Sequence, residues 1–179
     1  TLRLVFDADA DVDAIISELE AQPGVAYAEP NFIGGMCLTP TDPSFAQQQP
    51  EFDKIQLRDA WDIQPGANST VAVAVIDAGV ETWHPDLAGV LDVSASYNFV
   101  DNNTNIFDDI GHGTRVAGII GAPANNGEGI AGVAYGCKIV SYDVATAQGS
   151  ITSARVVSAL NATVANGYEI ANMSLKFGS

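Results

Sequence analysis

The sequence predicts an α/β domain with a mostly parallel sheet, preceded by a small unit that contains one amphipathic helix. Residues 71–77 form a continuous apolar run that ends in an aspartate, a pattern typical of a strand covered on both faces of a parallel sheet. Helical and β-rich patterns then alternate as far as residue 175. This alternation is typical of parallel strands that are connected by helices.

The first 35 residues are expected to form a strand, a helix and a second strand. The two β-rich segments are residues 2–6 and 25–30, and Pro23 and Gly24 end the helix between them. The helix is predicted by four apolar residues at i, i+3, i+4 and i+7: Val12, Ile15, Ile16 and Leu19. Domains below roughly 40 residues are seldom stable alone, so this α+β unit either packs against another part or is incomplete.

The composition changes over residues 34–50, which contain adjacent glycines, three prolines and three glutamines. This segment is predicted to be a linker. Beyond it we expect a helix directly after His112 and strands over residues 138–144 and 168–175. A helix between these two strands, closed by Asn166 and Gly167, is predicted by an apolar face: Val156, Val157, Leu160 and Val164.

The charge of the chain argues against two classes of partner. The formal net charge is −15, which would repel nucleic acid and anionic membranes. No apolar run approaches the roughly 18 residues needed to span a bilayer. An acidic surface fits cation binding, a secreted enzyme or a salty habitat. Cys37 and Cys137 are too few for a disulfide framework, so we expect two unpaired thiols.

Asp77 and His112 are the candidate catalytic pair. Asp77 ends an apolar strand, and the carboxyl ends of parallel strands are where ligands and catalytic groups gather in open α/β sheets. His112 stands between two glycines at the start of a helix, where the backbone can approach another segment closely. A carboxylate beside this histidine would fix the imidazole tautomer. The alternatives are that Asp77 only caps the next turn and that His112 is a core histidine.

Two other motifs receive weaker functional interpretations. GEGIAG (residues 127–132) matches the dinucleotide-binding fingerprint, but it follows a predicted helix and leads into a strand. A Rossmann nucleotide binder would need the opposite order, so this reading is disfavoured. His84 lies beside Pro85, with no further histidine or cysteine near enough for a metal site. We expect it to be a turn residue.

Two long motifs, AVIDAGVETWHPDL and GHGTRVAGIIGA, resemble the aspartate and histidine blocks of the subtilisin-like serine proteases, with Asp77 and His112 35 residues apart. GVAYAEPN is similar to the end of a subtilase propeptide, and TDPSFAQQQ to the start of the mature enzyme. HGTRVAG and ANNGEGIAGVAY resemble the kexin branch, whereas NMSL is closer to the subtilisin branch. Essentially the whole chain is covered.

The resemblance implies a three-layer α/β/α sandwich that is preceded by a ferredoxin-like propeptide remnant. Residues 1–35 would be the C-terminal half of an inhibitor-type propeptide, and residues 36–50 a linker and mature N-terminal arm. Residues 51–179 would be the N-terminal half of the catalytic domain. The resemblance also implies a zymogen that is secreted and whose own propeptide acts as intramolecular inhibitor and chaperone.

The implied activity is hydrolysis of peptide bonds in polypeptide substrates. Asp77 would orient His112, and His112 would be the general base toward a serine and then the acid toward the leaving amine. The family's serine block and its oxyanion-hole asparagine are not found in this sequence. The chain would then carry two of three triad members and would be inactive by itself.

The resemblance further implies a structural calcium ion and part of a substrate groove. The implied calcium ligands are the side chains of Asp42, Asp86 and Asn126 and the backbone carbonyls of Pro123, Glu128 and Ile130. The implied groove residues are Gly149, Ser150, Ser174, Leu175 and Lys176. Kexin-type enzymes carry a second acidic residue where this chain has Ala78, so specificity for dibasic sites is not expected. A different class remains as an alternative: a non-catalytic, subtilase-like binding module that truly ends at Ser179.

Overall fold

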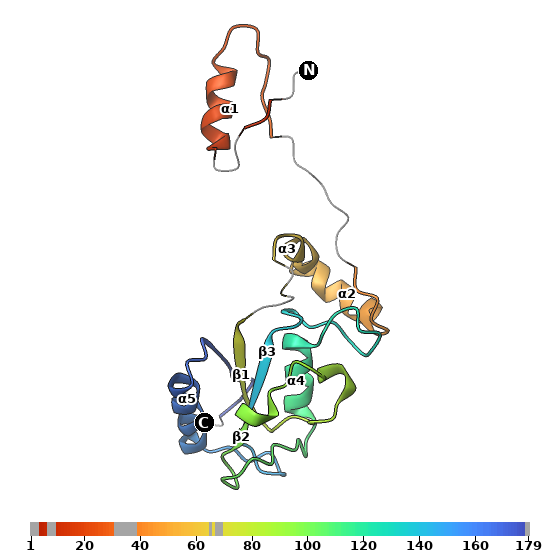
Figure 1. Cartoon of the computed structure of the whole chain (residues 1–179), viewed down its shortest axis with the longest axis vertical. Helices are drawn as coiled ribbons and strands as arrows, with labels where there is room; N and C mark the ends of the chain where they lie inside the picture. The colour runs from red at the N-terminus through yellow and green to blue at the C-terminus, as the bar shows by residue number, and fades with distance from the viewer. Residues whose placement is uncertain (1–3, 7–9, 31–38, 65, 67–69, 178–179) are drawn as a thin grey trace. The chain divides into compact units, whose positions relative to one another are not determined.

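The computed structural model describes residues 4–6, 10–30, 39–64, 66 and 70–177, and the chain divides into two compact units, residues 1–36 and 37–179 (Figure 1). Within these described ranges, no helix combines the length and the apolar character required to cross a bilayer.

The first unit contains the expected helix, α1 (Val12–Glu20). Its N-cap is Asp11, whose carboxylate accepts a hydrogen bond from the backbone N–H of Ala14 at 3.0 Å. The two flanking strands were predicted wrongly: residues 4–6 and 25–30 are not strands, and residues 2 and 3 lie outside the described part. A strand requires a neighbouring backbone as hydrogen-bond partner, and here the N–H of Ala28 bonds instead to the carboxylate of Glu20.

The second unit is built on a four-stranded sheet in the order β2-β3-β1-β4. The strands are β1 (Ala72–Asp77), β2 (Tyr97–Asn98), β3 (Lys138–Asp143) and β4 (Ile170–Asn172). All three strand pairs are parallel, which confirms the predicted sheet type. Asp77 pairs with Asp143 in the register of β1 and β3, so two carboxylates end adjacent central strands.

Helices α4 (His112–Gly121) and α5 (Ser153–Ala165) cover opposite faces of the sheet (Figure 1). Val73 and Val75 of β1 pack with Ala117 of α4. Ala74 and Ile76, which alternate with them, belong to the cluster that contains Val156 and Ala159 of α5. Because side chains of a strand alternate between its faces, the apolar residues 72–76 of β1 serve both layers. The three-layer sandwich is thereby confirmed.

Residues 45–50, which we predicted to be linker, belong to a helix, α2 (Phe45–Lys54), and α3 (Leu57–Ile63) follows it. These helices pack in a third cluster with residues of the loop after α4: Phe45, Phe52, Leu57, Trp61, Ala131 and Tyr135. The rings of Phe52, Trp61 and Tyr135 meet edge to face. The glutamine- and proline-rich composition concealed this buried aromatic face.

The remaining elements are short. Two 3₁₀ helices, η1 (Pro85–Leu87) and η2 (Val93–Ala95), lie between β1 and β2. The Asn166–Gly167 stop signal is confirmed, since Asn166 is the C-cap of α5 and Gly167 has φ +72°. Cys137 is buried and has no disulfide partner among the described residues, whereas Cys37 lies outside them.

Candidate active site

The carboxyl end of β1 brings Asp77 beside His112, which opens α4. Asp77 is only 2% exposed, and its Oδ1 lies 2.7 Å from His112 Nδ1. The same oxygen accepts a hydrogen bond from the backbone N–H of Ala78 at 2.8 Å. The carboxylate is therefore held from two sides at the edge of the sheet.

The imidazole of His112 has an exposed side, because 48% of its side chain is accessible to solvent. When Nδ1 carries the proton, it donates to Asp77 and leaves the lone pair of Nε2 free. A buried carboxylate that holds an exposed imidazole in one tautomer is typical of acyl-transfer hydrolases, in which the second ring nitrogen acts as the base. The core-histidine alternative does not fit this exposure.

Glycines allow this close approach between β1 and α4. A Cβ atom on Gly113 would overlap the carbonyl oxygen of Gly79 and would lie 3.2 Å from Cβ of Asp77. Gly111, the N-cap of α4, has φ +76°, a left-handed conformation that favours glycine. The glycines on both sides of His112 therefore bring the helix start against the end of the strand.

Asp108, which the sequence analysis did not single out, holds the start of α4. Its Oδ1 accepts from the backbone N–H groups of Ile110 (3.1 Å) and Gly111 (2.7 Å). Its Oδ2 accepts from the N–H (2.8 Å) and the hydroxyl (2.7 Å) of Thr114. An aspartate shortly before a glycine N-cap was the available signal, but Asp109 has the same character and makes the choice ambiguous.

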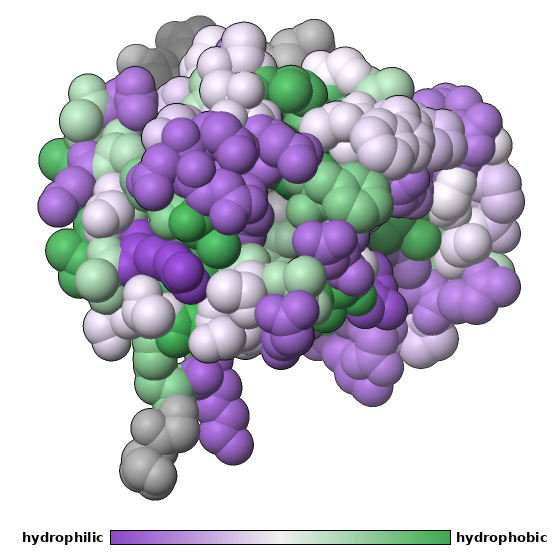
Figure 2. Space-filling view, turned by 90° about the horizontal axis from the view of Figure 1, so that it is seen from below, coloured by the Kyte–Doolittle hydropathy of each residue, from purple (hydrophilic) through white to green (hydrophobic). Residues whose placement is uncertain are grey.

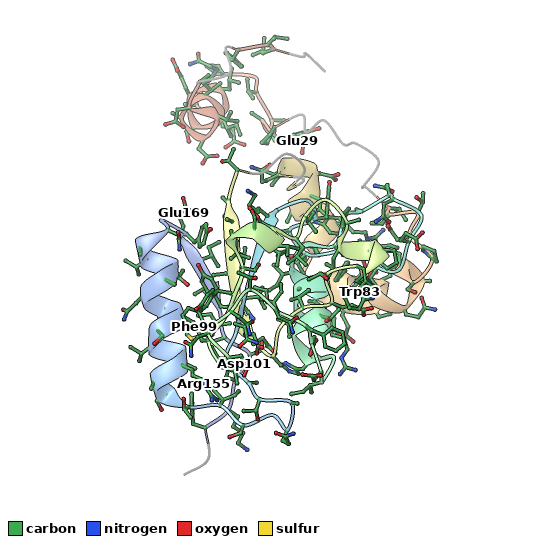
Figure 3. All side chains as sticks on the ribbon, turned by 60° about the horizontal axis from the view of Figure 1, so that its bottom comes forward. Glu29, Trp83, Phe99, Asp101, Arg155 and Glu169 are labelled. Carbon is green, nitrogen blue, oxygen red and sulfur yellow. The ribbon has the colours of Figure 1, made fainter. Side chains whose placement is uncertain are left out.

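Asp143 at the end of β3 lies in a different electrostatic setting. Burial raises the pKa of this carboxyl group to about 6, and repulsion from Asp101, Asp108 and Asp109 acts in the same direction, against the hydrogen bond from the N–H of Ala145. The carboxyl group borders a hollow of about 350 Å³, which Asp101 and Asp109 also line. Figure 3 shows Asp101 on the loop between β2 and α4. Acidic groups therefore gather beside the Asp77–His112 pair.

The two predicted groove segments lie in the second unit. Gly149 closes a tight turn in which its N–H donates to the carbonyl of Thr146 at 2.7 Å. A Cβ on Gly149 would lie 3.7 Å from the end of the Ile110 side chain, so this turn is close to the start of α4. Ser174 follows β4 and accepts a hydrogen bond from the side chain of Asn172 at 3.0 Å.

Other groove residues differ in burial. Ser150 and Lys176 are exposed, and Leu175 packs against the α5-side core. Figure 2, which views the molecule from below Figure 1, shows hydrophilic patches interspersed with apolar side chains. The assignment of these residues to a substrate groove stays a prediction.

The loop between α4 and β3 gathers the predicted calcium residues. Asp42 and Asp86 are each only 4% exposed. Asp86 accepts hydrogen bonds from the side-chain amide of Asn126 (3.1 Å) and the N–H of Ile130 (2.8 Å). Asp42 accepts from the N–H of Asn125 at 2.8 Å. Two carboxylates far apart in sequence thus bind neighbouring residues of one loop.

This loop also accounts for the GEGIAG motif, which runs from α4 toward β3 and does not open a helix. A Cβ on Gly129 would overlap Oδ2 of Asp86, so glycine is needed for the approach. Glu128 is exposed, and Pro123 follows the end of α4. His84 is the N-cap of η1, where its Nδ1 accepts from the N–H of Asp86 at 3.3 Å, as expected of a turn residue.

Comparisons with known proteins place these features in a family. Residues 68–177 match the family described as "Subtilase family", and residues 1–31 match the "Fervidolysin N-terminal prodomain". The chain is 37% identical over 165 residues to the thermophilic serine proteinase of Bacillus sp. (strain AK1), covering 92% of this chain and 40% of that protein. It is 39% identical over 137 residues to thermitase of Thermoactinomyces vulgaris, covering 76% of this chain and 48% of thermitase.

The structural comparison agrees. A protease from Pseudoalteromonas arctica PAMC 21717 has a TM-score of 0.64 at 28% identity, over 77% of this chain and 51% of that protease. The chain belongs to the subtilase family of serine proteases, with a fervidolysin-like prodomain segment at its N-terminal side. It spans less than half of the length of the two curated relatives described above.

Proposed function

We propose that this chain is part of a secreted subtilisin-like endopeptidase precursor and supplies Asp77 and His112 of an Asp-His-Ser triad. The observation that carries the proposal is the 2.7 Å contact between Asp77 Oδ1 and His112 Nδ1, made by a buried carboxylate and a half-exposed imidazole. The family supports the hydrolytic class, since one relative is an extracellular protease of Bacillus subtilis (strain 168).

Each residue has a defined part in the proposed reaction. His112 accepts the proton of a serine hydroxyl at Nε2 as the serine attacks the peptide carbonyl, and then gives that proton to the leaving amine. Asp77 keeps Nδ1 protonated and stabilises the imidazolium that forms between these steps. The serine and the oxyanion-hole asparagine would come from residues beyond this chain.

A direct experiment compares this chain with the full-length protein that contains it. The full-length protein should cleave an unstructured protein substrate and lose that activity on treatment with phenylmethylsulfonyl fluoride. The 179-residue chain should show no inhibitor-sensitive cleavage, because it lacks the proposed nucleophile and oxyanion donor. Inhibitor-sensitive cleavage by the 179-residue chain would contradict the proposed division of the triad.

The structural calcium ion is the second part of the proposal. Its support is Oδ1 of Asp42, which is buried and has no hydrogen-bond partner within the described residues. Neither Asp42 nor Asp86 forms an ion pair there, and no three His, Cys, Asp or Glu side chains cluster for a metal. Calcium suits such a place because it takes 6–8 oxygens, carbonyl and amide oxygens included.

The proposed ligands are oxygen atoms of two carboxylates, one amide and three backbone carbonyls: Asp42, Asp86, Asn126, Pro123, Glu128 and Ile130. Bound calcium would offset the charges of the two buried carboxylates and join the segment before α2 to the loop after α4. The N–H of Ser44 already bonds to the carbonyl of Gly129 at 2.8 Å, which supports this junction.

The prodomain segment and the groove complete the proposal. Residues 1–31 match a prodomain family, and we propose that this segment inhibits the enzyme and assists its folding before removal. In the proposed groove, an extended polypeptide would pair with two segments as a strand pairs with its neighbours. One segment contains Gly149 and Ser150, and the other contains Ser174, Leu175 and Lys176. Replacement of Gly149 by valine in the full-length enzyme should raise KM for peptides more than it lowers kcat.

A further inference from the structure

Asp108 connects the two sides of the Asp77–His112 pair. This buried carboxylate is the acceptor of four hydrogen bonds from Ile110, Gly111 and Thr114, the residues that surround His112. Helix α4 has no side-chain cap of its own, because its N-cap is Gly111. The first N–H groups of a helix need external acceptors, and Asp108 provides them from outside the helix.

Thr114 extends this arrangement to the loop that carries Asp77. Its hydroxyl donates to Oδ2 of Asp108 at 2.7 Å and accepts from the backbone N–H of Glu81 at 3.0 Å. Glu81 lies four residues after Asp77, beyond the turn at Gly79. One carboxylate thus fixes the helix start directly and the aspartate loop through a single hydroxyl group.

We propose that Asp108 is a positioning residue for the hydrolysis, acting through Gly111 and Thr114 to keep His112 aligned with Asp77. This inference rests on the proposed triad function, in which Nε2 must meet a serine hydroxyl at hydrogen-bond distance. Among the described residues, the hydrogen-bond partners of the Asp108 carboxylate are backbone N–H groups and the Thr114 hydroxyl, so Asp108 acts on the imidazole indirectly. Its negative charge at the positive end of α4 also favours the helix start.

The effect of losing Asp108 follows from the geometry of its four donors. In Asp108→Asn one oxygen becomes an amide NH₂, so one pair of N–H or O–H donors loses its acceptor. The helix start and the aspartate loop are then free to shift relative to each other. Misplacement of a catalytic group by about 1 Å costs on the order of 100-fold in rate, and the loss should fall on kcat because the proposed peptide-pairing segments keep their sequence.

The kinetic test uses four variants of the full-length enzyme, assayed well below their unfolding temperatures. Asp108→Asn should lower kcat by roughly 10- to 100-fold with KM changed less than about twofold. Thr114→Val should lower kcat several-fold, and Thr114→Ser, which keeps the hydroxyl, should restore it. Asp109→Asn is the matched control, because Asp109 is adjacent and accepts none of the four bonds. A kcat for Asp108→Asn equal to that of Asp109→Asn would overturn the proposal.

A second test uses NMR and does not depend on turnover. The chain has only two histidines, so their ring-proton signals can be assigned by replacing one of them. In the 179-residue chain, the Nδ1–H proton of His112 that bonds to Asp77 should give a low-field proton resonance. The signal should persist in His84→Gln and be weakened or broadened in Asp108→Asn and Thr114→Val. An unchanged signal in both variants would refute the positioning role, even if the full-length enzyme is an active protease.

The two tests separate this proposal from the proposed function. If the full-length protein shows no peptidase activity but the resonance depends on Asp108, the triad assignment fails and the positioning contact stands. If the enzyme is active and neither kcat nor the resonance depends on Asp108, only the positioning role fails. A stabilising role alone predicts a lower unfolding temperature for Asp108→Asn with kcat per folded molecule unchanged, and this result would also overturn the proposal.

Discussion

One pair of buried carboxylates lies at the start of α4 and a second pair lies beside the loop that follows α4, and the two pairs differ in their hydrogen-bond donors. At the N-terminal end, Asp77 and Asp108 accept from an imidazole, a hydroxyl and backbone N–H groups of the helix start. Among the described residues, the donors to the carboxylates of Asp42 and Asp86 are backbone N–H groups and one side-chain amide of the loop after α4. One oxygen of Asp42 has no partner among the described residues.

The helix dipole acts on the first of these two places. The N-terminus of a helix carries partial positive charge and the C-terminus partial negative charge. Asp77 and Asp108 lie near the N-terminal end of α4, where the partial positive charge favours carboxylates. Asp42 and Asp86 lie beside the loop that follows α4, and no basic side chain among the described residues forms an ion pair with them. The first place suits proton transfer, and the second suits a cation from solution.

The largest expected effect comes from replacing the residues of the Asp77–His112 pair. In the full-length enzyme, His112→Ala and Asp77→Ala should each lower kcat/KM by on the order of 10⁴-fold or more, because the members of a triad act as a unit. His84→Gln, which changes the other histidine, is the control and should keep near-normal activity. The measurement is hydrolysis of a peptide substrate, with circular dichroism to show that the variants are folded. Near-normal activity in Asp77→Ala would contradict its orienting role.

The second prediction tests the proposed calcium site beside the loop that follows α4. Thermal unfolding of the full-length enzyme should show a midpoint that rises with free calcium, since a ligand bound only by the folded state stabilises that state. At about 1,000 times the dissociation constant the stabilisation is about 4 kcal/mol, or a shift on the order of 10 °C. Asp86→Ala should abolish the response.

Glu128→Ala is the matched control for this site, because the proposed ligand is the backbone carbonyl and the side chain is exposed. Its unfolding midpoint should respond to calcium as the wild type does. A calcium response that survives in Asp86→Ala would exclude the proposed site.

Much of the sheet could be predicted from the sequence, because β1 and the face of α5 are apolar with the periods of a strand and a helix. The approach of His112 to Asp77 was also expected, since both stand at the ends of elements that a parallel sheet brings to one edge. The two-residue strand β2 was missed because Tyr97 and Asn98 are too few for a periodic pattern.

The errors have physical causes of the same kind. Phe45 and Phe52 form one face of α2, but intervening glutamines and Pro50 masked the pattern. Residues 4–6 and 25–30 have strand-like composition, yet a strand depends on a partner that local composition does not specify. Asp108 was missed because its structural role depends on four hydrogen bonds that form only in the folded chain. The sequence shows a carboxylate there but does not show which donors meet it.

The third prediction concerns Asp143, a buried carboxyl group that is repelled by neighbouring carboxylates and forms no ion pair within the described part of the chain. Its pKa is about 6 in the folded state against an ordinary value of 3.8, because burial disfavours its charge. The folded state then binds the proton more tightly than the unfolded state, so stability falls as pH rises from about 4 through 6. Asp143→Asn removes this penalty and keeps an acceptor for the N–H of Ala145.

The measurement is the free energy of unfolding of both proteins between pH 4 and pH 8. The variant should match the wild type near pH 4 and exceed it above pH 6 by at most about 3 kcal/mol. A difference between the two proteins that does not change with pH would show that Asp143 titrates normally.

The smallest expected effect concerns Asp92, a partly exposed carboxylate. Its pKa is shifted in the direction opposite to that of Asp143. Hydrogen bonds from Ser94 and Lys138 lower its pKa to about 2, and the Lys138 ammonium lies 2.9 Å from Oδ2. Because the folded-state pKa lies below 3.8, its contribution is fully present above about pH 4 and is lost as pH falls through 2. Asp92→Asn should therefore lower the free energy of unfolding by about 1 kcal/mol at pH 7, since exposed pairs are screened, and by progressively less as the pH falls toward and below 2. Lys138→Met leaves the Ser94 bond in place and should therefore lower the free energy of unfolding by less. A larger decrease in Lys138→Met than in Asp92→Asn would assign the effect to the lysine instead of the carboxylate.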